Sequence, residues 1–289
     1  MSSNGISLLN LLLIKIHINS VHPIYYLLLC CLLSINCMAD GRLYNNLEEA
    51  LKTPAEVKRL KLRNLDSLPA SIGLLINLEE LDLSKNKLTY LPKEIGDLKK
   101  LKELILFRNK LTELPESIGK LEQLERLVLS TNRLKNLPAS IGRLSKLKEL
   151  SVKSNVLDSI PSSIDGCYSL VRLYLEYNQL TALPKTIGDL PHLEQLTLER
   201  NLLNDLPKEI GNCTSIRVLS VSRNQFNNFP MGICKLENLQ LLDLSYCGVI
   251  GPLPDCLRYF QSLDRLYIDN RVSVPMSLTS RTRPQIFVK

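Results

Sequence analysis

The sequence has few aromatic and few imidazole side chains. None of its 289 residues is tryptophan, five are phenylalanine and three are histidine, while hydrophobic residues make up 45%. A core of this composition has to be built from leucine and isoleucine. Beyond residue 39 the one histidine is His192, in the stretch LPHLEQL, where a surface turn residue is expected rather than a catalytic base.

The signatures of common enzymes and metal sites are absent as well. The sequence has no GxSxG, HExxH or phosphate-binding loop, its cysteines have no histidine nearby, and none of them has CxxC spacing. We therefore expect a protein with no catalytic residues, no metal and no cofactor.

Charge of one sign is not concentrated anywhere in the chain. The net charge of +7 is modest, and lysine alternates with glutamate in stretches such as LKKLKEL and LEQLERL. A nucleic-acid-binding protein usually gathers its basic residues on one face. The alternation instead indicates a mixed, solvated surface and no nucleic-acid partner.

Residues 1–39 differ in composition from the rest of the chain. The apolar run from Ile24 to Ile35 is shorter than the roughly 20 residues that a membrane-spanning helix needs. It matches the apolar part of an export signal, with small residues before Asp40 where a signal peptidase would cut. Processing at Cys37 is the second possibility: Leu33-Ser-Ile-Asn36 resembles a loose lipobox, so Cys37 is a candidate lipidation site.

Two other interpretations of this segment stay open. A second apolar run, from Ile6 to Ile18, would allow the whole segment to be a membrane anchor. Alternatively Met38 is the true start of translation. A membrane contact is therefore expected only through an N-terminal signal, anchor or lipid.

The rest of the chain is built on one repeated unit. Leu101 to Gln123 reads LKELILFRNKLTELPESIGKLEQ, and its pattern LxxLxLxxNxLxxLPxxIGxLxx returns every 23 residues. A fixed period of this length is typical of a solenoid, in which each unit contacts only its neighbours. The units open at Leu78, Leu101, Leu124, Leu147, Leu170, Leu193, Ile216 and Leu239.

Each part of the unit predicts a local structure. The alternating leucines of LxxLxL predict a strand with one face buried, and the LP dipeptide marks the point where the chain leaves the sheet. The IGxLxxL tail predicts a short helical or 3-10 segment. The asparagine in each unit can satisfy backbone groups at a tight turn, which gives a ladder of Asn86, Asn109, Asn132, Asn155, Asn178, Asn201 and Asn224.

The ends depart from the pattern as caps of a solenoid do. We expect an N-terminal capping helix from Tyr44 to Pro54, capped by Asn45 or Asn46, within residues 40–56. Repeats fill 57–262. Residues 263–289 hold a last degenerate repeat and a C-terminal cap, in which Gln285 to Val288 is a candidate closing edge strand.

The cysteines within the repeats fit hydrophobic slots. Cys167 and Cys213 stand where other units have leucine, which predicts small buried side chains, and Cys247 stands in the asparagine slot. Cys234 and Cys256 lie in adjacent units at a similar height. Whether they form a disulfide is left open by the sequence.

These repeats resemble the leucine-rich repeat family, in the 23-residue type of bacterial repeat proteins and of the Ras-group-related plant and animal proteins. The match covers about 57–280, and the entry YNNLEEALKTPAEVKRLKL resembles the N-terminal cap of exported bacterial members. The resemblance implies an α/β solenoid, a horseshoe with a concave parallel β-sheet and a convex face of short helical or 3-10 segments. It also implies a protein-binding role, without fixing the ligand.

Alternation places four residues of each unit on the concave face: the third, fifth, seventh and eighth. Two groups among them, both in the middle of the array, differ from a solvated background. The first, the apolar group, consists of Ile105, Phe107 and Val128. The second, the tyrosine group, mixes aromatic, acidic and arginine side chains as interface hot spots do, and consists of Arg172, Tyr174, Glu176, Tyr177 and Arg200. The candidate ligand-binding residues are Ile105, Phe107, Arg108, Val128, Arg172, Tyr174, Glu176, Tyr177 and Arg200.

The sequence therefore favours a non-enzymatic module that binds a protein or peptide on its concave face. An exported, periplasmic or surface-associated bacterial protein is expected, and a monomer. The alternative is a cytosolic scaffold or signalling regulator that starts at Met38. A self-associating structural protein is a third possibility.

Overall fold

The computed structural model describes residues 41–279 and 284–289. The chain divides into two units, Met1–Arg42 and Leu43–Lys289. The second unit is called the repeat array here. The predicted export signal, the alternative start at Met38 and the candidate lipidation residue Cys37 lie outside the described residues.

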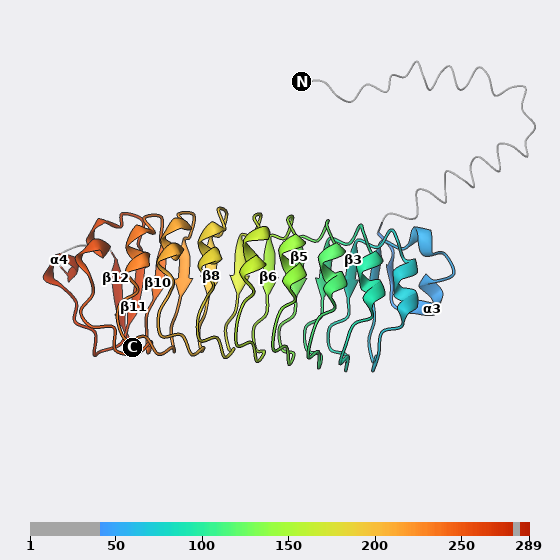
Figure 1. Ribbon diagram of the computed structural model, residues 1–289, viewed down its shortest axis with the longest axis horizontal. Helices are drawn as coiled ribbons and strands as arrows, with labels where there is room; N and C mark the ends of the chain where they lie inside the picture. The colour runs from blue at the N-terminus through green and yellow to red at the C-terminus, as the bar shows by residue number, and fades with distance from the viewer. Residues whose placement is uncertain (1–40, 280–283) are drawn as a thin grey trace, which may run out of the picture. The chain divides into compact units, whose positions relative to one another are not determined.

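The repeat array carries one parallel sheet of 12 strands whose order in space is their order in sequence (Figure 1). Each strand pairs with that of the next unit in register, so Leu81 lies beside Leu104 and Leu104 beside Leu127. The strands are β1 (Leu43–Tyr44), β2 (Arg59–Lys61), β3 (Glu80–Asp82), β4 (Glu103–Ile105), β5 (Arg126–Val128), β6 (Glu149–Ser151), β7 (Arg172–Tyr174), β8 (Gln195–Thr197), β9 (Val218–Ser220), β10 (Leu241–Asp243), β11 (Arg265–Ile268) and β12 (Gln285–Val288).

A short 3-10 helix begins at or directly after a proline in each of these units. Pro92 is a typical start: its φ of −66° suits the residue before the helix, and the helix ends when the backbone N–H of Leu98 donates to the carbonyl of Ile95. The 3-10 helices are η2 (Pro54–Glu56), η3 (Ala70–Leu74), η4 (Lys93–Asp97), η5 (Glu116–Lys120), η6 (Ala139–Arg143), η7 (Ser162–Gly166), η8 (Lys185–Asp189), η9 (Lys208–Asn212), η10 (Met231–Lys235) and η11 (Asp255–Tyr259).

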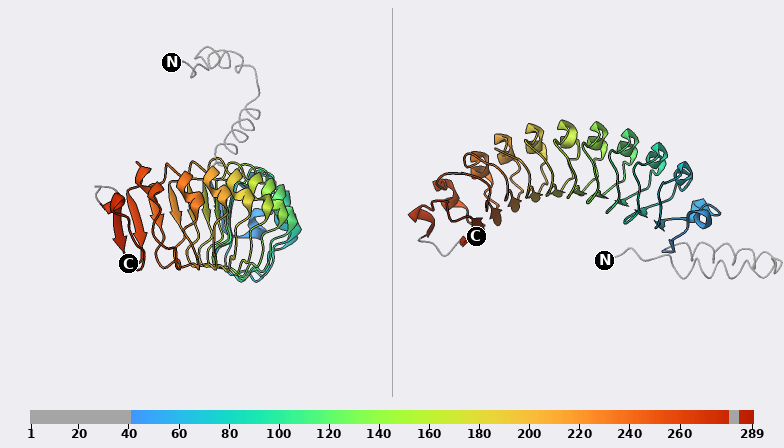
Figure 2. Two further views of the ribbon diagram at one scale, coloured as in Figure 1. Left: turned by 60° about the vertical axis from the view of Figure 1, so that its left-hand side comes forward. Right: turned by 90° about the horizontal axis from the view of Figure 1, so that it is seen from below.

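The array curves, with the strands on the inner side and the 3-10 helices on the outer side (Figure 2, right). A helical turn is wider than a strand, so a stack that pairs strands 23 residues apart must spread on its helical side. The horseshoe with a concave parallel sheet, expected from the resemblance, is confirmed.

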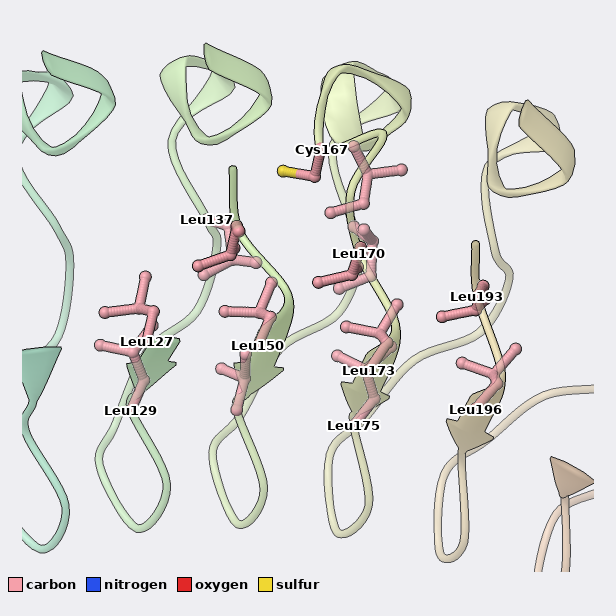
Figure 3. Close-up of a cluster of buried hydrophobic side chains, with 14 of the residues drawn as sticks. Leu127, Leu129, Leu137, Leu150, Cys167, Leu170, Leu173, Leu175, Leu193 and Leu196 are labelled. Atoms are coloured by element: carbon pink, nitrogen blue, oxygen red, sulfur yellow. The ribbon is translucent and has the colours of Figure 1, made fainter. Parts of the chain in front are cut away.

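The core is a stack of leucine layers (Figure 3). Leu127, Leu150, Leu173 and Leu196 occupy the same slot in four consecutive units, and none of them is exposed. Cys167 belongs to the same core. Its burial, and then the charge of Asp165, raise the pKa of this thiol to about 12, so the cysteine is an apolar filler.

Asparagine side chains fasten each unit to the one before it. Asn109 Oδ1 accepts a hydrogen bond from the backbone N–H of Leu88 at 3.1 Å, and Asn109 Nδ2 donates to the carbonyls of Leu83 at 2.9 Å and Leu106 at 3.1 Å. Equivalent bonds recur at Asn86, Asn132, Asn155, Asn178, Asn201 and Asn224.

The N-terminal cap is smaller than the helix expected from Tyr44 to Pro54. Helix α3 covers only Leu47–Ala50, and Asn46 caps it, since its side-chain oxygen accepts from the Glu49 N–H at 3.0 Å. Leu43 and Tyr44 instead pair with β2, and Pro54 opens η2. The helix is short because both of its flanks join the solenoid.

At the C-terminal end, β12 pairs with β11, so the predicted closing edge strand is confirmed. A short helix not expected from the sequence, α4 (Met276–Thr279), contacts η11. Cys234 and Cys256 form a disulfide that joins η10 to η11. Cys247, in the asparagine slot, is buried, and the ladder gives way there to a bridge between Phe226 and Gly248.

Candidate ligand-binding face

The candidate site lies on the concave face of the middle strands. Each side chain there comes from a position that the strand geometry turns away from the core. Behind β4 to β8 the buried leucines hold the strands in register, so the outward side chains form straight rows across units. A row brings together residues that are 23 apart in the sequence.

The predicted apolar group is contiguous in the structure. Ile105 and Val128 are register partners on β4 and β5, and Phe107 follows two residues after Ile105 on the same face. All three are half-buried, and Arg108 beside them is exposed with a φ of 56°. The group offers an apolar surface on a sheet face where polar side chains are otherwise usual.

The predicted tyrosine group contains a lysine that sequence reasoning missed. Lys153 Nζ lies 4.2 Å from the centre of the Tyr174 ring and 3.0 Å from Glu176 Oε1. The Tyr174 hydroxyl donates to Gln195 Oε1 at 3.3 Å. Lys153 and Glu176 are each the seventh residue of their units. The repeat therefore places them side by side in one row, and this spacing could have identified Lys153 from the sequence.

The same group continues further along the array than predicted. The Arg200 guanidinium lies 5.0 Å from the Tyr177 ring centre, and that of Arg223 lies 5.1 Å from the Tyr246 ring centre. Glu199 joins them, at 3.9 Å from Arg200 Nε and 3.5 Å from Arg223 Nε. Tyrosine and arginine thus form a half-exposed row in the eighth position of four consecutive units.

Arg172, which the sequence groups with the tyrosines, turns away from them. Its Nε donates to Glu149 Oε2 at 3.0 Å, and Glu149 Oε1 accepts from Arg126 Nε at 3.1 Å. Arg126 also pairs with Glu103, so four side chains alternate in charge across β4 to β7. Burial raises the pKa of Glu149, but the hydrogen bonds from Arg126 and Arg172 outweigh it and hold that pKa below its usual range.

Two buried polar atoms of the tyrosine group have no hydrogen-bond partner within the described chain. They are Glu176 Oε2 and Thr197 Oγ1, on adjacent units. Burying a polar atom without a hydrogen-bond partner costs free energy, so such atoms are rare in native protein structures. Both atoms are closed off from the surface, and Ser117 Oγ in η5 and Ser140 Oγ in η6 share the property, so it does not by itself distinguish the tyrosine group.

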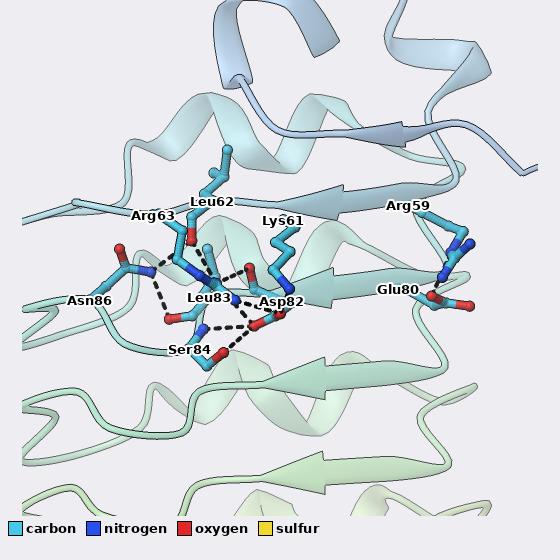
Figure 4. Close-up of polar contacts among 9 residues, drawn as sticks. All are labelled: Arg59, Lys61, Leu62, Arg63, Glu80, Asp82, Leu83, Ser84 and Asn86. Carbon is cyan, nitrogen blue, oxygen red and sulfur yellow. Dashed lines mark hydrogen bonds and ion pairs between the residues drawn. The ribbon is translucent and has the colours of Figure 1, made fainter.

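A second polar cluster, not expected from the sequence, lies near the N-terminal end of the concave face (Figure 4). Both Asp82 oxygens accept from Arg63, at 3.2 and 2.8 Å, and Lys61 Nζ lies 3.3 Å from Asp82 Oδ2. Burial raises the pKa of Asp82, but the hydrogen bonds from Arg63, Ser84 and Lys61 hold it well below its usual range. A hollow of about 240 Å³ lies beside this cluster.

The charges of this polar cluster are paired within the chain. Asp82 also accepts from the backbone N–H of Ser84 at 2.9 Å, which leaves it fully engaged. Within residues 41–279 and 284–289, no group of three or more histidine, cysteine, aspartate or glutamate side chains is arranged to hold a metal ion. In the same part of the chain, no helix has the length and apolar character needed to cross a membrane.

Comparisons with known proteins agree with this architecture. Profiles of leucine-rich repeat families match residues 59–111, 95–176 and 238–260. No curated protein matches the sequence. A solved plant peptide hormone receptor, RGFR1 in complex with RGF2, is 33% identical with a TM-score of 0.67, over 78% of this chain and 39% of the receptor chain.

Two further solved structures share the fold. A TDR receptor is 27% identical with a TM-score of 0.64, over 75% of this chain and 38% of that one. The internalin InlF of Listeria monocytogenes is 18% identical with a TM-score of 0.73, over 86% and 73%. The chain thus spans about two fifths of the two receptor chains. The repeats, their register and these matches together place the chain in the leucine-rich repeat family.

Proposed function

We propose that the chain is a non-enzymatic binding module that docks a protein or peptide on the concave face, across the units within residues 101–200. Phe107 anchors one side of the ligand and Tyr174 with Tyr177 the other. The observation that carries this proposal is the aromatic and cationic character of the tyrosine group: Tyr177 is 46% exposed, and Lys153 and Arg200 lie 4.2 and 5.0 Å from the ring centres of Tyr174 and Tyr177.

The chemistry of the two groups supports a macromolecular ligand. Tyrosine and arginine are, with tryptophan, the residue types enriched in interface hot spots, and an apolar patch nearby would exclude water from the contact. The inner side of the curve also lets one ligand touch strands from several units. The plant receptor at 33% identity is described as a peptide hormone receptor, which is consistent with a peptide or protein ligand here.

The test is a binding measurement with matched variants. The ligand is first captured by crosslinking to the full chain, and its affinity is then measured by titration calorimetry. We expect Phe107→Ala and Tyr174→Ala each to weaken binding by about 2 kcal/mol, roughly 30-fold, with little change in melting temperature. Tyr168→Ala is the control, because Tyr168 is an exposed tyrosine that follows η7 on the helical side. Unchanged affinity in both concave-face variants would refute this site.

For localisation we propose export to the cell surface or periplasm. The Cys234–Cys256 disulfide supports this, since disulfides persist in oxidising compartments and are rare in the cytosol. The apolar run before Asp40 agrees with an export signal. A bacterial source is supported by the resemblance of the N-terminal entry to exported bacterial members.

Mass spectrometry of the mature N-terminus, combined with cell fractionation, tests the localisation. An N-terminus at Asp40, or a lipidated Cys37, in the exported fraction is the expected result. A protein that begins at Met38 and stays in the cytosol would instead make the chain an intracellular scaffold. That outcome would leave the binding proposal standing, because the concave face lies wholly beyond Met38.

A further inference from the structure

The loops that leave the carboxyl ends of the strands form one long edge of the repeat array, the lower edge in Figure 1. In the three units within residues 78–146, the eighth, tenth, twelfth and thirteenth residues of each unit are exposed along this edge. Six of these twelve residues are cations and one, Glu113, is an acid. The six cations, called the basic edge here, are Lys85, Lys87, Arg108, Lys110, Arg133 and Lys135.

This concentration of charge arises from the repeat, because cations that are 23 residues apart in the sequence lie side by side in space. The same edge positions of the next four units, within residues 147–238, carry two arginines and two aspartates: Arg200, Arg223, Asp158 and Asp205. The basic edge is therefore a local feature of three units. There the evenly mixed surface expected from the alternation of lysine and glutamate is not found.

Backbone hydrogen bonds between neighbouring loops hold the basic edge in fixed rows. The N–H of Lys110 donates to the carbonyl of Leu88, the residue after Lys87, at 2.9 Å. The N–H of Arg133 donates to the carbonyl of Leu111, the residue after Lys110, also at 2.9 Å. The row of Lys87, Lys110 and Arg133 is thus carried by backbone that repeats at about the strand spacing, roughly 4.8 Å per unit.

Most charges of the basic edge have no acidic partner. Lys87 Nζ lies 3.5 Å from Asp66 Oδ1, and both side chains are largely exposed. Within residues 41–279 and 284–289, the other five cations of the basic edge form no ion pair. Because like charges gathered on one surface repel each other, an anionic ligand would relieve this repulsion.

We propose that the basic edge binds an acidic polysaccharide, a chain of sugar rings with a carboxylate or sulfate group on successive rings. A linear polyanion fits because the cations stand in open rows across three units and do not converge on one enclosed site. The rows repeat once per strand spacing, and a pyranose ring advances a polysaccharide chain by a similar length. The exposed hydroxyl groups of Thr89, Thr112 and Thr131 lie among the cations and can form hydrogen bonds with sugar hydroxyls.

Two other linear polyanions fit the basic edge less well. An extended acidic peptide directs side chains to one face only at every second residue, about 6.7 Å apart, which is out of step with the rows. Single-stranded nucleic acid is bound by stacking its bases on aromatic rings, and Tyr90 is the one aromatic residue among the twelve edge positions. The Tyr90 side chain, 53% exposed, offers a face on which one sugar ring can stack.

The first test measures the binding of two polysaccharides to the full chain by titration calorimetry: heparin, which is sulfated, and polygalacturonate, which is carboxylated. Lys87→Gln/Lys110→Gln/Lys135→Gln removes three charges of the basic edge. We expect it to weaken binding at least about tenfold, because fewer contacts release fewer counterions from the polyanion. The variant spares Arg108, which is also a candidate residue of the concave face, so the peptide proposal and this one can fail separately.

The control is Lys120→Gln/Lys185→Gln/Lys208→Gln, which removes three exposed lysines of η5, η8 and η9 and changes the net charge equally. It should change the affinity less than about threefold, since net charge alone acts weakly at a distance in salt. An equal loss in both triple variants would show attraction to net charge and would overturn the site.

Salt and competing polyanions test the nature of the ligand. The affinity of the unchanged chain should fall at least about tenfold between 50 and 200 mM salt. Binding of only one polysaccharide would identify sulfate or carboxylate as the recognised group. No binding of either at 50 mM salt would overturn the proposal. Tighter binding of oligo-deoxythymidylate or polyglutamate than of both polysaccharides would overturn the assignment of the ligand.

The second test locates the contact on the unchanged chain, so it does not depend on the folding of a variant. Lysine side chains are acetylated with and without bound heparin, and their modification is measured by mass spectrometry. Heparin should protect the four lysines of the basic edge and leave Lys185 and Lys208 as reactive as in the free chain. Equal protection of Lys185 and Lys208 would contradict a site at the basic edge.

Discussion

At the residue scale, the array depends on a two-residue turn that recurs from unit to unit. The eighth residue takes a positive φ in nine units, without a glycine in any of them, and the asparagine follows it in seven. The left-handed conformation aims the asparagine side chain at the backbone of the preceding unit. The hydrogen bonds of that side chain then offset the cost of the strained residue before it.

Asn132→Ala should test this turn directly. The variant leaves the N–H of Leu111 and the carbonyls of Leu106 and Leu129 without these partners inside the core. We expect a loss of about 2–3 kcal/mol in the free energy of unfolding, measured by urea denaturation, because buried unsatisfied backbone groups are costly. Asn204→Ala, at an exposed position, should change it by less than about 0.5 kcal/mol. Equal effects at both positions would refute the structural role of the ladder.

Thr131→Gly should raise stability, although glycine usually lowers it. Thr131 is exposed and β-branched, and its φ is 60°, a conformation that costs L-residues about 1–2 kcal/mol and glycine almost nothing. After the larger entropy of the glycine chain is subtracted, a gain of roughly 0.5–1 kcal/mol remains. Thr181→Gly, at an exposed position without positive φ, should lower stability instead. A loss in both variants would mean that the turn is not strained.

At the scale of elements, the Asp82 cluster ties the ends of β2 and β3 together. The hydrogen bonds that lower the pKa of Asp82 stabilise its charged form in the folded state. The stability that they add is therefore fully present above the unfolded pKa of about 4, and it is lost as the pH falls through the lower folded pKa. Asp82→Asn should reduce stability at neutral pH and flatten its decline in acid.

Urea unfolding midpoints, measured from about pH 2 to 7 in both proteins, check this pH dependence. Asp66→Asn is the control, because the Asp66 side chain is 81% exposed and its Oδ1 lies 3.5 Å from the exposed Nζ of Lys87. If the urea midpoint of Asp82→Asn falls with decreasing pH as steeply as that of the unchanged chain, other carboxylates dominate the loss of stability in acid.

The disulfide acts between two elements, η10 and η11. It closes a loop between residues 22 apart in the sequence, and in the chain-entropy model a loop of this size stabilises the fold by about 3 kcal/mol. The Cys234→Ala/Cys256→Ala double variant should lose that amount, first in the C-terminal units, as followed by limited proteolysis. Reductant should have the same effect on the repeat array of the unchanged chain and none on that of the double variant, since the other cysteines within residues 41–279 and 284–289, Cys167, Cys213 and Cys247, are buried thiols.

At the scale of the whole molecule, the period of 23 residues carries most of the information. It predicts the strand at Leu104, the 3-10 helix after Pro92 and the buried position of Cys167, because each unit repeats the same local chemistry. The face of each outward side chain follows from alternation. The partner of a long side chain does not follow from alternation. Lys153 and Arg172 each have several neighbours within reach, and the choice among them depends on how the surrounding charges are arranged in space. The ends were also harder to predict, because α3 and α4 lie where the period stops.

Stability should therefore be distributed along the array as a chain of neighbour contacts, so that position decides what a core substitution does. Leu129→Asp buries an unpaired carboxylate in the middle, where both halves lose their stacking partner, and should abolish most of the far-ultraviolet circular dichroism signal. Leu266→Asp makes the same change at β11, which has one strand beyond it, and should release only the C-terminal units. Limited proteolysis would then leave a protected N-terminal fragment in Leu266→Asp and none in Leu129→Asp. Complete unfolding in both variants would mean that the array melts as one globular unit, contrary to a solenoid held by nearest-neighbour contacts.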